Sequence, residues 1–365
     1  MPIGIFDSGY GGLTILKEIK KKLPEYDYIY LGDNARAPYG TRSFDVVYDY
    51  TLQAVKALFD KGCPLVILAC NTASAKALRT IQQNDLPEID ESRRVLGIIR
   101  PTTEYLPLVS KSRHIGLLAT EGTVASHSYK LELEKLAPEM VITEHACPMW
   151  VPLVETNEAS SPGADYFVQK EISALLDSDP LIDTVVLGCT HYPLLIDKID
   201  KYLRPGINIV SQGKIVAESL KDYLNRHPEI SNRCEKNGKT EFFTTENPEK
   251  FNAMASLFIK EEVKSRHISL PYNPDCQPIE ISIENIRNLL PDEAILLLDK
   301  IINDNPENEE ALTLRGMKHW AKGHRSLAIK DYLAAIRINP ESKAKMALEA
   351  ANSILDFYNK DLLNP

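Results

Sequence analysis

Two cysteines follow the same kind of apolar segment in two distant parts of the chain. Cys70 comes directly after Val66–Ala69, and Cys189 after Val185–Gly188. Small hydrogen-bonding residues follow each, and then a segment that can start a helix, whose free N–H groups favour a thiolate. A lone cysteine of this kind is more commonly a buried small hydrophobe. A matched pair, however, can flank one ligand and do acid–base chemistry on two opposite faces of a carbon atom.

Two further turns carry polar residues after predicted strands. Asp7–Gly12 follows the apolar run Ile3–Phe6 and contains three glycines, which let backbone N–H groups approach a ligand. The P-loop lysine and the G-x-G-x-x-G spacing are both missing, so a phosphate site is not favoured. Asp7 can orient an ammonium group, tune a thiol or simply cap a turn. The second turn, Gly32–Gly40, by itself indicates only a loop rich in proline and glycine.

The elements that must position these residues alternate between strand and helix. Short apolar runs separated by amphipathic segments are typical of α/β folds with mainly parallel sheets, which bind ligands beyond their strand ends. The predicted strands are Ile3–Phe6, Tyr26–Leu31, Leu65–Ala69, Val95–Ile99, His114–Ala119, Val141–Ala146, Thr184–Leu187, Asn208–Val210 and Thr240–Thr244. Helices are predicted at Leu13–Lys22, Phe44–Lys61, Ser74–Gln83, Lys214–Leu224 and Pro248–Ile259.

The chain of 365 residues is long enough for two or three domains. We predict one α/β domain from residues 1–97 and 210–264, and a similar one from residues 98–209, facing a shared active-site cleft. Residues 265–278 hold three prolines among polar residues and are predicted to form a linker. Residues 279–365 have an all-helical pattern and are predicted to form a separate module.

This tail contains an internal repeat. Three positions recur after 34 residues: Ala294, Leu298 and Pro306 match Ala328, Tyr332 and Pro340. Small residues stand where two helices of a hairpin would pack: Gly316, Gly323 and Ala335. A 34-residue helical period is typical of tetratricopeptide repeats. We therefore predict a tetratricopeptide-like module, capped by a helix over Ser342–Tyr358, with a groove suited to a protein partner.

Composition restricts the class of protein. The net charge of −9 argues against a nucleic-acid binder with a basic face. The first residues do not resemble a signal peptide, and no apolar run is long enough to span a bilayer, so we expect a cytoplasmic protein without a membrane role. Its six cysteines should then be reduced. Cys63, Cys147, Cys234 and Cys276 lack metal-type spacing and are predicted to be core or loop residues.

Six motifs, taken together and in order, resemble those of the glutamate racemases of the aspartate/glutamate racemase superfamily. They are Phe6–Leu13, Gly32-Asp33 with Pro38–Gly40, Ala69–Ala75, Leu118–Val124, Pro152–Glu155 and Leu187–Leu195. The resemblance covers roughly residues 2–260. It implies interconversion of L- and D-glutamate without pyridoxal phosphate or metal, supply of D-glutamate for peptidoglycan, and a homodimer.

The resemblance also implies roles for individual residues. Cys70 would act on D-glutamate and Cys189 on L-glutamate. Asp7 and His191 would assist proton movement, with Glu155 supporting His191. The residues that would hold the substrate are Asp7, Ser8, Pro38, Tyr39, Gly40, Asn71, Thr72, Thr120, Thr123, Thr190 and His191. One departure from the family pattern is Ser211-Gln212, which stands where an aspartate is often seen.

Three other functions stay open at this point. A racemase of the same superfamily could act on aspartate or another amino acid, because pocket size decides the substrate. A thiol hydrolase could use Cys189 with His191, but that function leaves the matched Cys70 without a role. A repeat-based adaptor could carry an inactive racemase half, although the intact cysteine pair argues against it.

Overall fold

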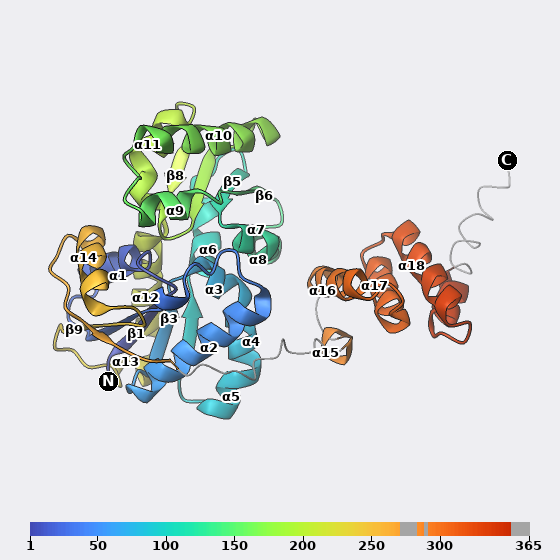
Figure 1. Ribbon diagram of the computed structural model, residues 1–365, viewed down its shortest axis with the longest axis horizontal. Coiled ribbons are helices and arrows are strands. Elements are labelled where there is room, and N and C mark those ends of the chain that lie inside the picture. The colour runs from blue at the N-terminus through green and yellow to red at the C-terminus, as the bar shows by residue number, and fades with distance from the viewer. Residues whose placement is uncertain (271–282, 288–290, 352–365) are drawn as a thin grey trace. The chain divides into compact units, whose positions relative to one another are not determined.

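The computed structural model describes residues 1–270, 283–287 and 291–351. The chain divides into two compact units, Met1–Asn273 and Pro274–Pro365. All ten strands of the described residues lie in the first unit, where they form two separate sheets (Figure 1). The described part of the second unit is helical. Two parallel-sheet α/β domains and a helical tail confirm the predicted fold class.

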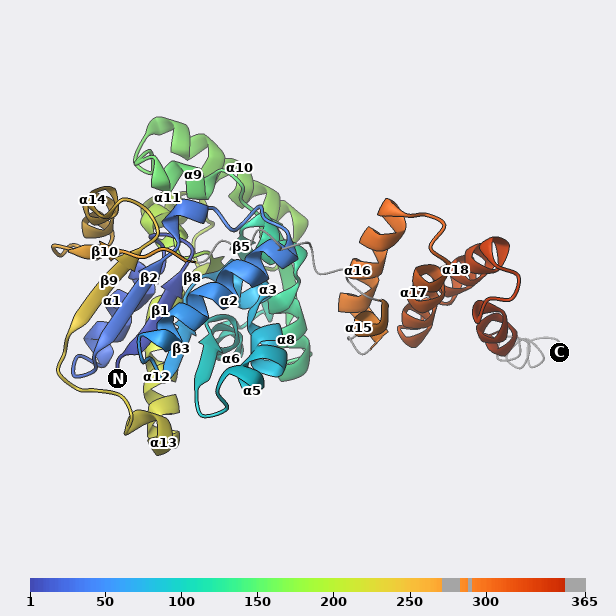
Figure 2. The same cartoon turned by 60° about the horizontal axis from the view of Figure 1, so that its bottom comes forward.

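The larger sheet has six parallel strands in the order β10-β9-β2-β1-β3-β4. Their bounds are β1 Ile3–Asp7, β2 Tyr28–Gly32, β3 Leu65–Leu68, β4 Arg94–Gly97, β9 Thr240–Thr244 and β10 Ser265–His267. Alternate side chains of β1 face opposite sides. Ile3 and Ile5 pack in one core with α1 (Leu13–Lys22) and α12 (Gln212–Arg226). Phe6 packs in another core with α2 (Phe44–Asp60), which crosses the other face of the sheet in Figure 2.

The smaller sheet has four parallel strands in the order β6-β5-β7-β8. These strands are β5 His114–Ala119, β6 Val141–Ala146, β7 Thr184–Gly188 and β8 Asn208–Val210. Helices α6 (Ile99–Val109) and α8 (Ser128–Leu136) contribute to the core on one face, and α10 (Pro162–Ser178) and α11 (Ile196–Tyr202) to the core on the other. Both sheets are thus buried on both faces, which explains their nearly continuous apolar strands.

Further helices fill the connections of the first unit. They are η1 Asn34–Arg36, α3 Asn71–Lys76, α4 Leu78–Thr80, η2 Ile81–Asp85, α5 Leu86–Ile89, α7 Glu121–Ala125, α9 Trp150–Glu155, η3 Tyr192–Leu195, α13 Pro228–Ser231 and α14 Pro248–Ile259.

Two predicted segments differ from the structure by more than a residue or two at their ends. The single helix expected at Ser74–Gln83 starts earlier, at Asn71, and breaks into three pieces. The segment from Ser265 was expected to be a linker, but Ser265–His267 form β10 and pair in parallel with β9. Ile268 and Leu270 then pack against the core beneath α2, so apolar side chains keep this segment on the first unit.

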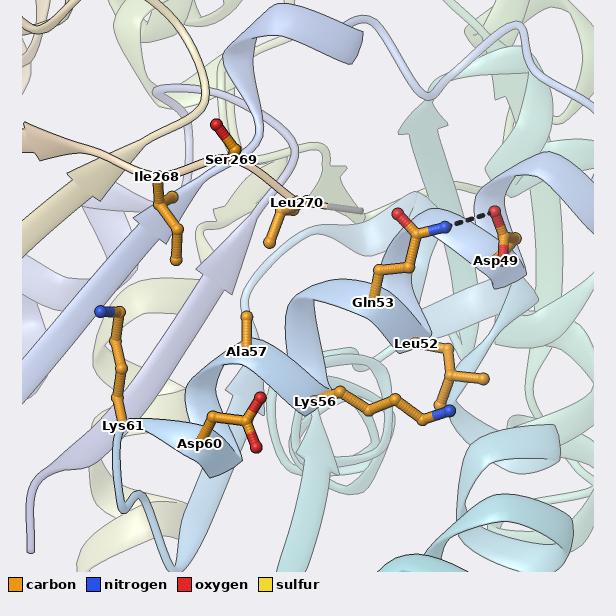
Figure 3. A pocket seen from close by; sticks show the side chains of 10 residues that line it. All are labelled: Asp49, Leu52, Gln53, Lys56, Ala57, Asp60, Lys61, Ile268, Ser269 and Leu270. Atoms are coloured by element: carbon orange, nitrogen blue, oxygen red, sulfur yellow. Dashed lines mark hydrogen bonds between the residues drawn. The ribbon is translucent and has the colours of Figure 1, made fainter. Parts of the chain in front are cut away.

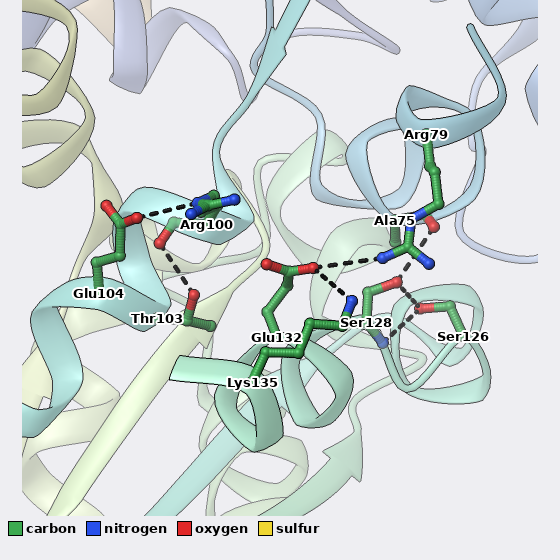
Figure 4. A network of polar contacts seen from close by, with 9 residues as sticks. All are labelled: Ala75, Arg79, Arg100, Thr103, Glu104, Ser126, Ser128, Glu132 and Lys135. Atoms are coloured by element: carbon green, nitrogen blue, oxygen red, sulfur yellow. Dashed lines mark hydrogen bonds and ion pairs between the residues drawn. The ribbon is translucent and has the colours of Figure 1, made fainter. Parts of the chain in front are cut away.

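Polar contacts join the two α/β parts near α3 and α8 (Figure 4). The Arg79 guanidinium lies 3.4 Å from a Glu132 carboxylate oxygen, which also lies 3.3 Å from the Lys135 ammonium. The Ser128 hydroxyl donates to the backbone oxygen of Ala75 at 3.1 Å. Partly exposed ion pairs of this kind are worth little individually, up to about 1 kcal/mol. The Ser128–Ala75 bond links α8 to α3, which carries the residues after Cys70, and the Arg79–Glu132 pair links α8 to α4.

The second unit contains α15 Ile283–Arg287, α16 Pro291–Asp304, α17 Glu309–Ala321 and α18 Arg325–Ile338, and residues 344–351 are again helical. Ala294 and Leu298 are buried in one apolar cluster, and their 34-residue counterparts Ala328 and Tyr332 are buried in the next. A Cβ on Gly316 would lie 2.5 Å from the Tyr332 ring, so that position must be small.

Gly323 does not pack between helices as predicted. Its φ of +76° places it at the turn after α17, where glycine is favoured because other residues rarely adopt positive φ. The tetratricopeptide identity of this unit stays a prediction. The end of the predicted capping helix, at Tyr358, lies outside the described residues.

Candidate active site

Both cysteines line one cavity, to which the carboxyl ends of strands from the two sheets contribute. β7 leads directly into Cys189, and β3 reaches Cys70 through Ala69, while β1 and β5 end next to Ser8 and Thr120. The cavity holds about 90 Å³. Its lining consists of Ser8, Ala37, Pro38, Tyr39, Gly40, Thr41, Cys70, Asn71, Thr72, Thr120, Glu121, Cys147, Pro148, Val151, Pro152, Glu155, Cys189, Thr190 and His191.

Cys70 sits in surroundings that favour the neutral thiol. Its Sγ lies 3.4 Å from the Ser8 hydroxyl and the residue is only 6% exposed. Burial, together with the negative charge of Asp7, raises the pKa of the Cys70 thiol to about 12. Asp7 is itself fully buried, and burial raises the pKa of its carboxyl although His191 and the backbone N–H groups of Gly9 and Gly12 act the other way.

Cys189 has a different partner. Its Sγ lies 3.8 Å from His191 Nδ1, and His191 Nε2 lies 3.1 Å from a Glu155 carboxylate oxygen. Burial disfavours the charged imidazole, but hydrogen bonds to Cys189 and Glu155 outweigh burial and raise the pKa of His191 to about 10. The imidazole is therefore protonated at neutral pH. A cation at this place stabilises a thiolate on Cys189.

The glycine turn after β1 brings the two cysteine environments together. A Cβ on Gly11 would lie 2.2 Å from the Thr190 hydroxyl and 2.6 Å from His191 Nδ1, so no larger residue fits there. The Thr190 hydroxyl in turn donates to an Asp7 carboxylate oxygen at 3.4 Å. Asp7 thus contacts the segment after Cys189 and also influences Cys70 electrostatically.

Three threonine hydroxyls form a cluster, and two of them, those of Thr72 and Thr120, belong to residues that line the cavity. Thr72 lies 3.0 Å from Thr120 and 3.4 Å from Thr123, and Thr120 lies 3.1 Å from Thr123. Gly40 packs against them, since a Cβ there would lie 2.9 Å from the Thr120 Cβ. Hydroxyls can reorient toward a ligand, so this cluster can donate to a carboxylate without a permanent positive charge.

Tyr39 is held by a buried carboxylate. Its hydroxyl donates to an Asp33 oxygen at 2.5 Å, and Arg36 Nε donates to the same oxygen at 2.7 Å. The Thr245 hydroxyl donates to the other Asp33 oxygen at 2.8 Å. Asp33 therefore fixes the loop that carries Pro38, Tyr39 and Gly40 along the cavity.

A second, more open cavity of about 650 Å³ lies between α2 and the segment Ile268–Leu270 (Figure 3). Its lining residues are Asp49, Leu52, Gln53, Lys56, Ala57, Asp60, Lys61, Ile268, Ser269 and Leu270. This lining contains neither cysteine nor histidine, and it balances two carboxylates with two ammonium groups. It offers no nucleophile or acid–base pair of the kind that the cysteine cavity has.

Across the described residues, no group of three or more histidine, cysteine, aspartate and glutamate side chains is placed to hold a metal ion. None of the described helices combines the length and apolarity needed to cross a bilayer.

The model of the Asp/Glu/hydantoin racemase family matches residues 12–220. The chain belongs to the Asp/Glu/hydantoin racemase family. The glutamate racemase of Ruegeria sp. is 40% identical over 273 residues, which are 72% of this chain and 98% of that protein. A glutamate racemase of Streptococcus thermophilus is 37% identical, over 74% of this chain and 96% of that one.

Solved structures of this racemase family share the fold. Glutamate racemase RacE1 of Bacillus anthracis aligns with a TM-score of 0.68 and 33% identity, over 74% of this chain and 98% of that one. Glutamate racemase of Francisella tularensis, solved with D-glutamate, aligns with a TM-score of 0.65 and 32% identity, over 74% of this chain and 97% of that one. The alignments leave about a quarter of this racemase-family chain unmatched.

Twelve of the fourteen predicted site residues line the cavity of this family member, and two do not. Asp7 lies in contact with Thr190, and Thr123 lies in contact with Thr72 and Thr120. Sequence reasoning missed Cys147, which lines the cavity although it was predicted to be a core or loop residue. The signal was present, because Cys147 directly follows β6 as Cys70 follows the segment of β3.

Proposed function

We propose that the chain is a glutamate racemase, an isomerase that interconverts L- and D-glutamate with Cys70 and Cys189 as its two acid–base groups. The observation that carries this proposal is a pair of thiols from two sheets on one cavity, in opposite electrostatic surroundings. The curated relatives are glutamate racemases, and the Francisella structure contains D-glutamate.

The charges around the two cysteines support an assignment of which thiolate removes the α-proton in each direction of racemisation. In the resting state Cys70 keeps its proton, and the His191 cation stabilises a thiolate on Cys189. The Cys189 thiolate removes the α-proton of L-glutamate, and the Cys70 thiol gives its proton to the opposite face, leaving D-glutamate. The reverse reaction starts from the Cys70 thiolate and the Cys189 thiol. Because burial raises the pKa of the Asp7 carboxyl, Asp7 can exchange a proton as Cys70 changes charge.

The substrate carboxylates need hydrogen-bond donors. The hydroxyls of Thr72, Thr120 and Thr123 are clustered within 3.4 Å of one another and can turn toward an anion. Donors aimed at the α-carboxylate also stabilise the negative charge that grows there as the α-proton leaves. In this proposal, neither the removal of the α-proton nor the delivery of the new proton uses a cofactor or a metal ion.

The test is a circular-dichroism assay of purified, dialysed protein with each glutamate enantiomer, without added pyridoxal phosphate or metal. Cys70→Ala should lower kcat by at least about 10²–10⁴-fold, the usual contribution of a general acid or base. Cys63→Ala is the matched control, because Cys63 is also buried with its pKa raised to about 12 but does not line the cavity. Wild-type protein that leaves both enantiomers unchanged would overturn the proposal.

We further propose that the D-glutamate supplies peptidoglycan synthesis in the cytoplasm, that the enzyme works as a homodimer, and that the helical unit binds a protein partner. Rescue of a D-glutamate auxotroph tests the first of these roles. Rescue by the wild-type chain but not by Cys189→Ala is the expected result. Growth that also appears with Cys189→Ala would contradict it.

A further inference from the structure

Gln212 occupies a buried place next to the cysteine cavity. It is the first residue of α12 and only 2% of it is exposed. Its Oε1 accepts from Asn71 Nδ2 at 2.6 Å. Its Nε2 lies close to four acceptors: the Tyr129 hydroxyl at 2.8 Å, Thr102 Oγ1 at 3.0 Å, Asn71 Oδ1 at 3.2 Å and the Ile98 backbone oxygen at 3.4 Å.

These contacts hold the Asn71 amide from both ends. Asn71 Oδ1 accepts from the Tyr129 hydroxyl at 2.8 Å and from Gln212, while its Nδ2 donates back to Gln212. Asn71 directly follows Cys70 and is the first residue of α3. The orientation of this amide therefore sets where the chain turns immediately after the thiol.

The same contacts join the two α/β parts. Asn71 follows β3 of the six-stranded sheet, whereas Tyr129 lies on α8, which covers the four-stranded sheet that leads to Cys189. Gln212 bonds to both. We propose that Gln212 is a positioning residue. It holds the Asn71 side chain against Tyr129 and thereby fixes the position of Cys70 relative to Cys189. This inference rests on the proposed racemase function and concerns the same site.

The chemistry of glutamine suits this task. A side-chain amide both donates and accepts, so one residue can satisfy the opposed ends of the Asn71 amide. An apolar residue of similar length would leave Asn71, Tyr129 and Thr102 without this partner in a buried place. Such groups would shift to find other partners, and small displacements of reacting groups are costly in rate.

The test uses Gln212→Met, which keeps side-chain length and removes the amide. Gln82→Met is the matched control, since it removes a glutamine hydrogen bond to the Val95 backbone oxygen, away from the cavity. We expect kcat/KM of Gln212→Met to fall roughly 10–100-fold, the effect of misplacing a reacting group, and Gln82→Met to stay close to wild type. Tyr129→Phe removes one hydroxyl of the same network and should show a smaller loss in the same direction.

A second readout does not depend on racemisation. The rates at which iodoacetamide labels Cys70 and Cys189 are measured separately by peptide mass spectrometry on the folded proteins. In Gln212→Met the rate at Cys70 relative to Cys189 should rise about fivefold, the equilibrium factor for one lost net hydrogen bond. If the wild-type protein does not racemise glutamate, the proposed function fails, and the labelling ratio still decides the role of Gln212.

An unchanged labelling ratio in Gln212→Met would overturn the proposal. So would equal acceleration at both cysteines, which would show general loosening of the fold. If Gln212→Met does not fold, the labelling ratio of Tyr129→Phe decides in the same way: a rise at Cys70 alone supports the positioning role, and any other result contradicts it.

Discussion

His191→Asn removes the cation that faces Cys189 and leaves a polar side chain in its place. The pKa of His191 is about 10, about 3.5 pH units above the ordinary 6.5. At 1.36 kcal/mol for each pH unit, this corresponds to about 5 kcal/mol, which is the net excess of the interactions with Cys189 and Glu155 over the cost of burial. Removing one hydrogen bond to a charged group typically costs about 1.5–3 kcal/mol, and a loss of roughly 2 kcal/mol corresponds to about 30-fold in rate.

The expected result is a fall of kcat/KM of about 30-fold at neutral pH. The fall must be equal for L- and D-glutamate, because the equilibrium constant between enantiomers is one. The loss should shrink as pH rises, because solvent then deprotonates the thiol without help from a cation. The assay is circular dichroism with each enantiomer over a pH series. His145→Asn is the matched control, since His145 lies 2.7 Å from Glu171 in a similar pair but does not line the cavity.

A His191→Asn variant with wild-type kcat/KM at neutral pH would refute this reasoning. A loss that grows as pH rises would refute it equally, because the missing cation matters most where the thiol is otherwise protonated. A matching loss in His145→Asn would indicate that any histidine–glutamate pair in this part of the fold affects turnover indirectly.

Three further predictions concern packing, pH and the tail. Gly11→Ala should lower kcat/KM by roughly 100-fold in the racemisation assay, because its Cβ would displace the Thr190 hydroxyl or His191. Asp183→Asn should lower the free energy of unfolding in urea by about 1–3 kcal/mol at neutral pH. Its pKa is lowered from 3.8 to about 2 in the folded state, so the difference from wild type is present above about pH 4 and disappears as pH falls through 2. Deleting residues 279–365 should leave a folded racemase with wild-type kcat and melting behaviour in calorimetry.

The first two of these have matched control variants, and all three have an outcome that would contradict them. Gly163→Ala should be tolerated, because a Cβ there lies 3.6 Å or more from its neighbours, and equal damage by both glycine variants would contradict the Gly11 argument. Asp222→Asn removes an exposed pair with Arg226 and should change stability by less than about 1 kcal/mol. An Asp183→Asn variant that differs from wild type as much at pH 2 as at pH 7 would contradict the linkage. An insoluble or inactive truncated protein would show that the tail belongs to the enzyme.

The position of each thiol at the carboxyl end of its own sheet was predictable from sequence, whereas their meeting depends on how the two sheets face each other. Carboxyl ends of parallel strands lie at one edge of a sheet, so polar residues after apolar runs gather there. Cys70 and Cys189 follow this rule, and so does Thr120 after β5. The parallel pairing itself follows from strands that read as continuous apolar runs with helices between them.

Other features depend on tertiary contacts that no local pattern reveals. Gln212 begins an amphipathic helix, and nothing in its neighbours along the chain indicates that it reaches Asn71 and Tyr129. The strand Ser265–His267 is short, polar and followed by prolines, so its sequence predicts a linker. It is a strand only because it pairs with β9. Whether Gly323 packs between two helices or forms the turn after α17 depends likewise on the position of α18.

The most direct test of the two-thiol account follows hydrogen isotopes during conversion of L-glutamate in D₂O. When Cys189 removes the proton and Cys70 supplies another, early D-glutamate carries deuterium at Cα, because the thiol that delivers it has exchanged with solvent. The L-glutamate recovered at the same time should still carry protium. D-glutamate that retains the original protium would show that one group both removes and returns the proton, and it would contradict the central claim.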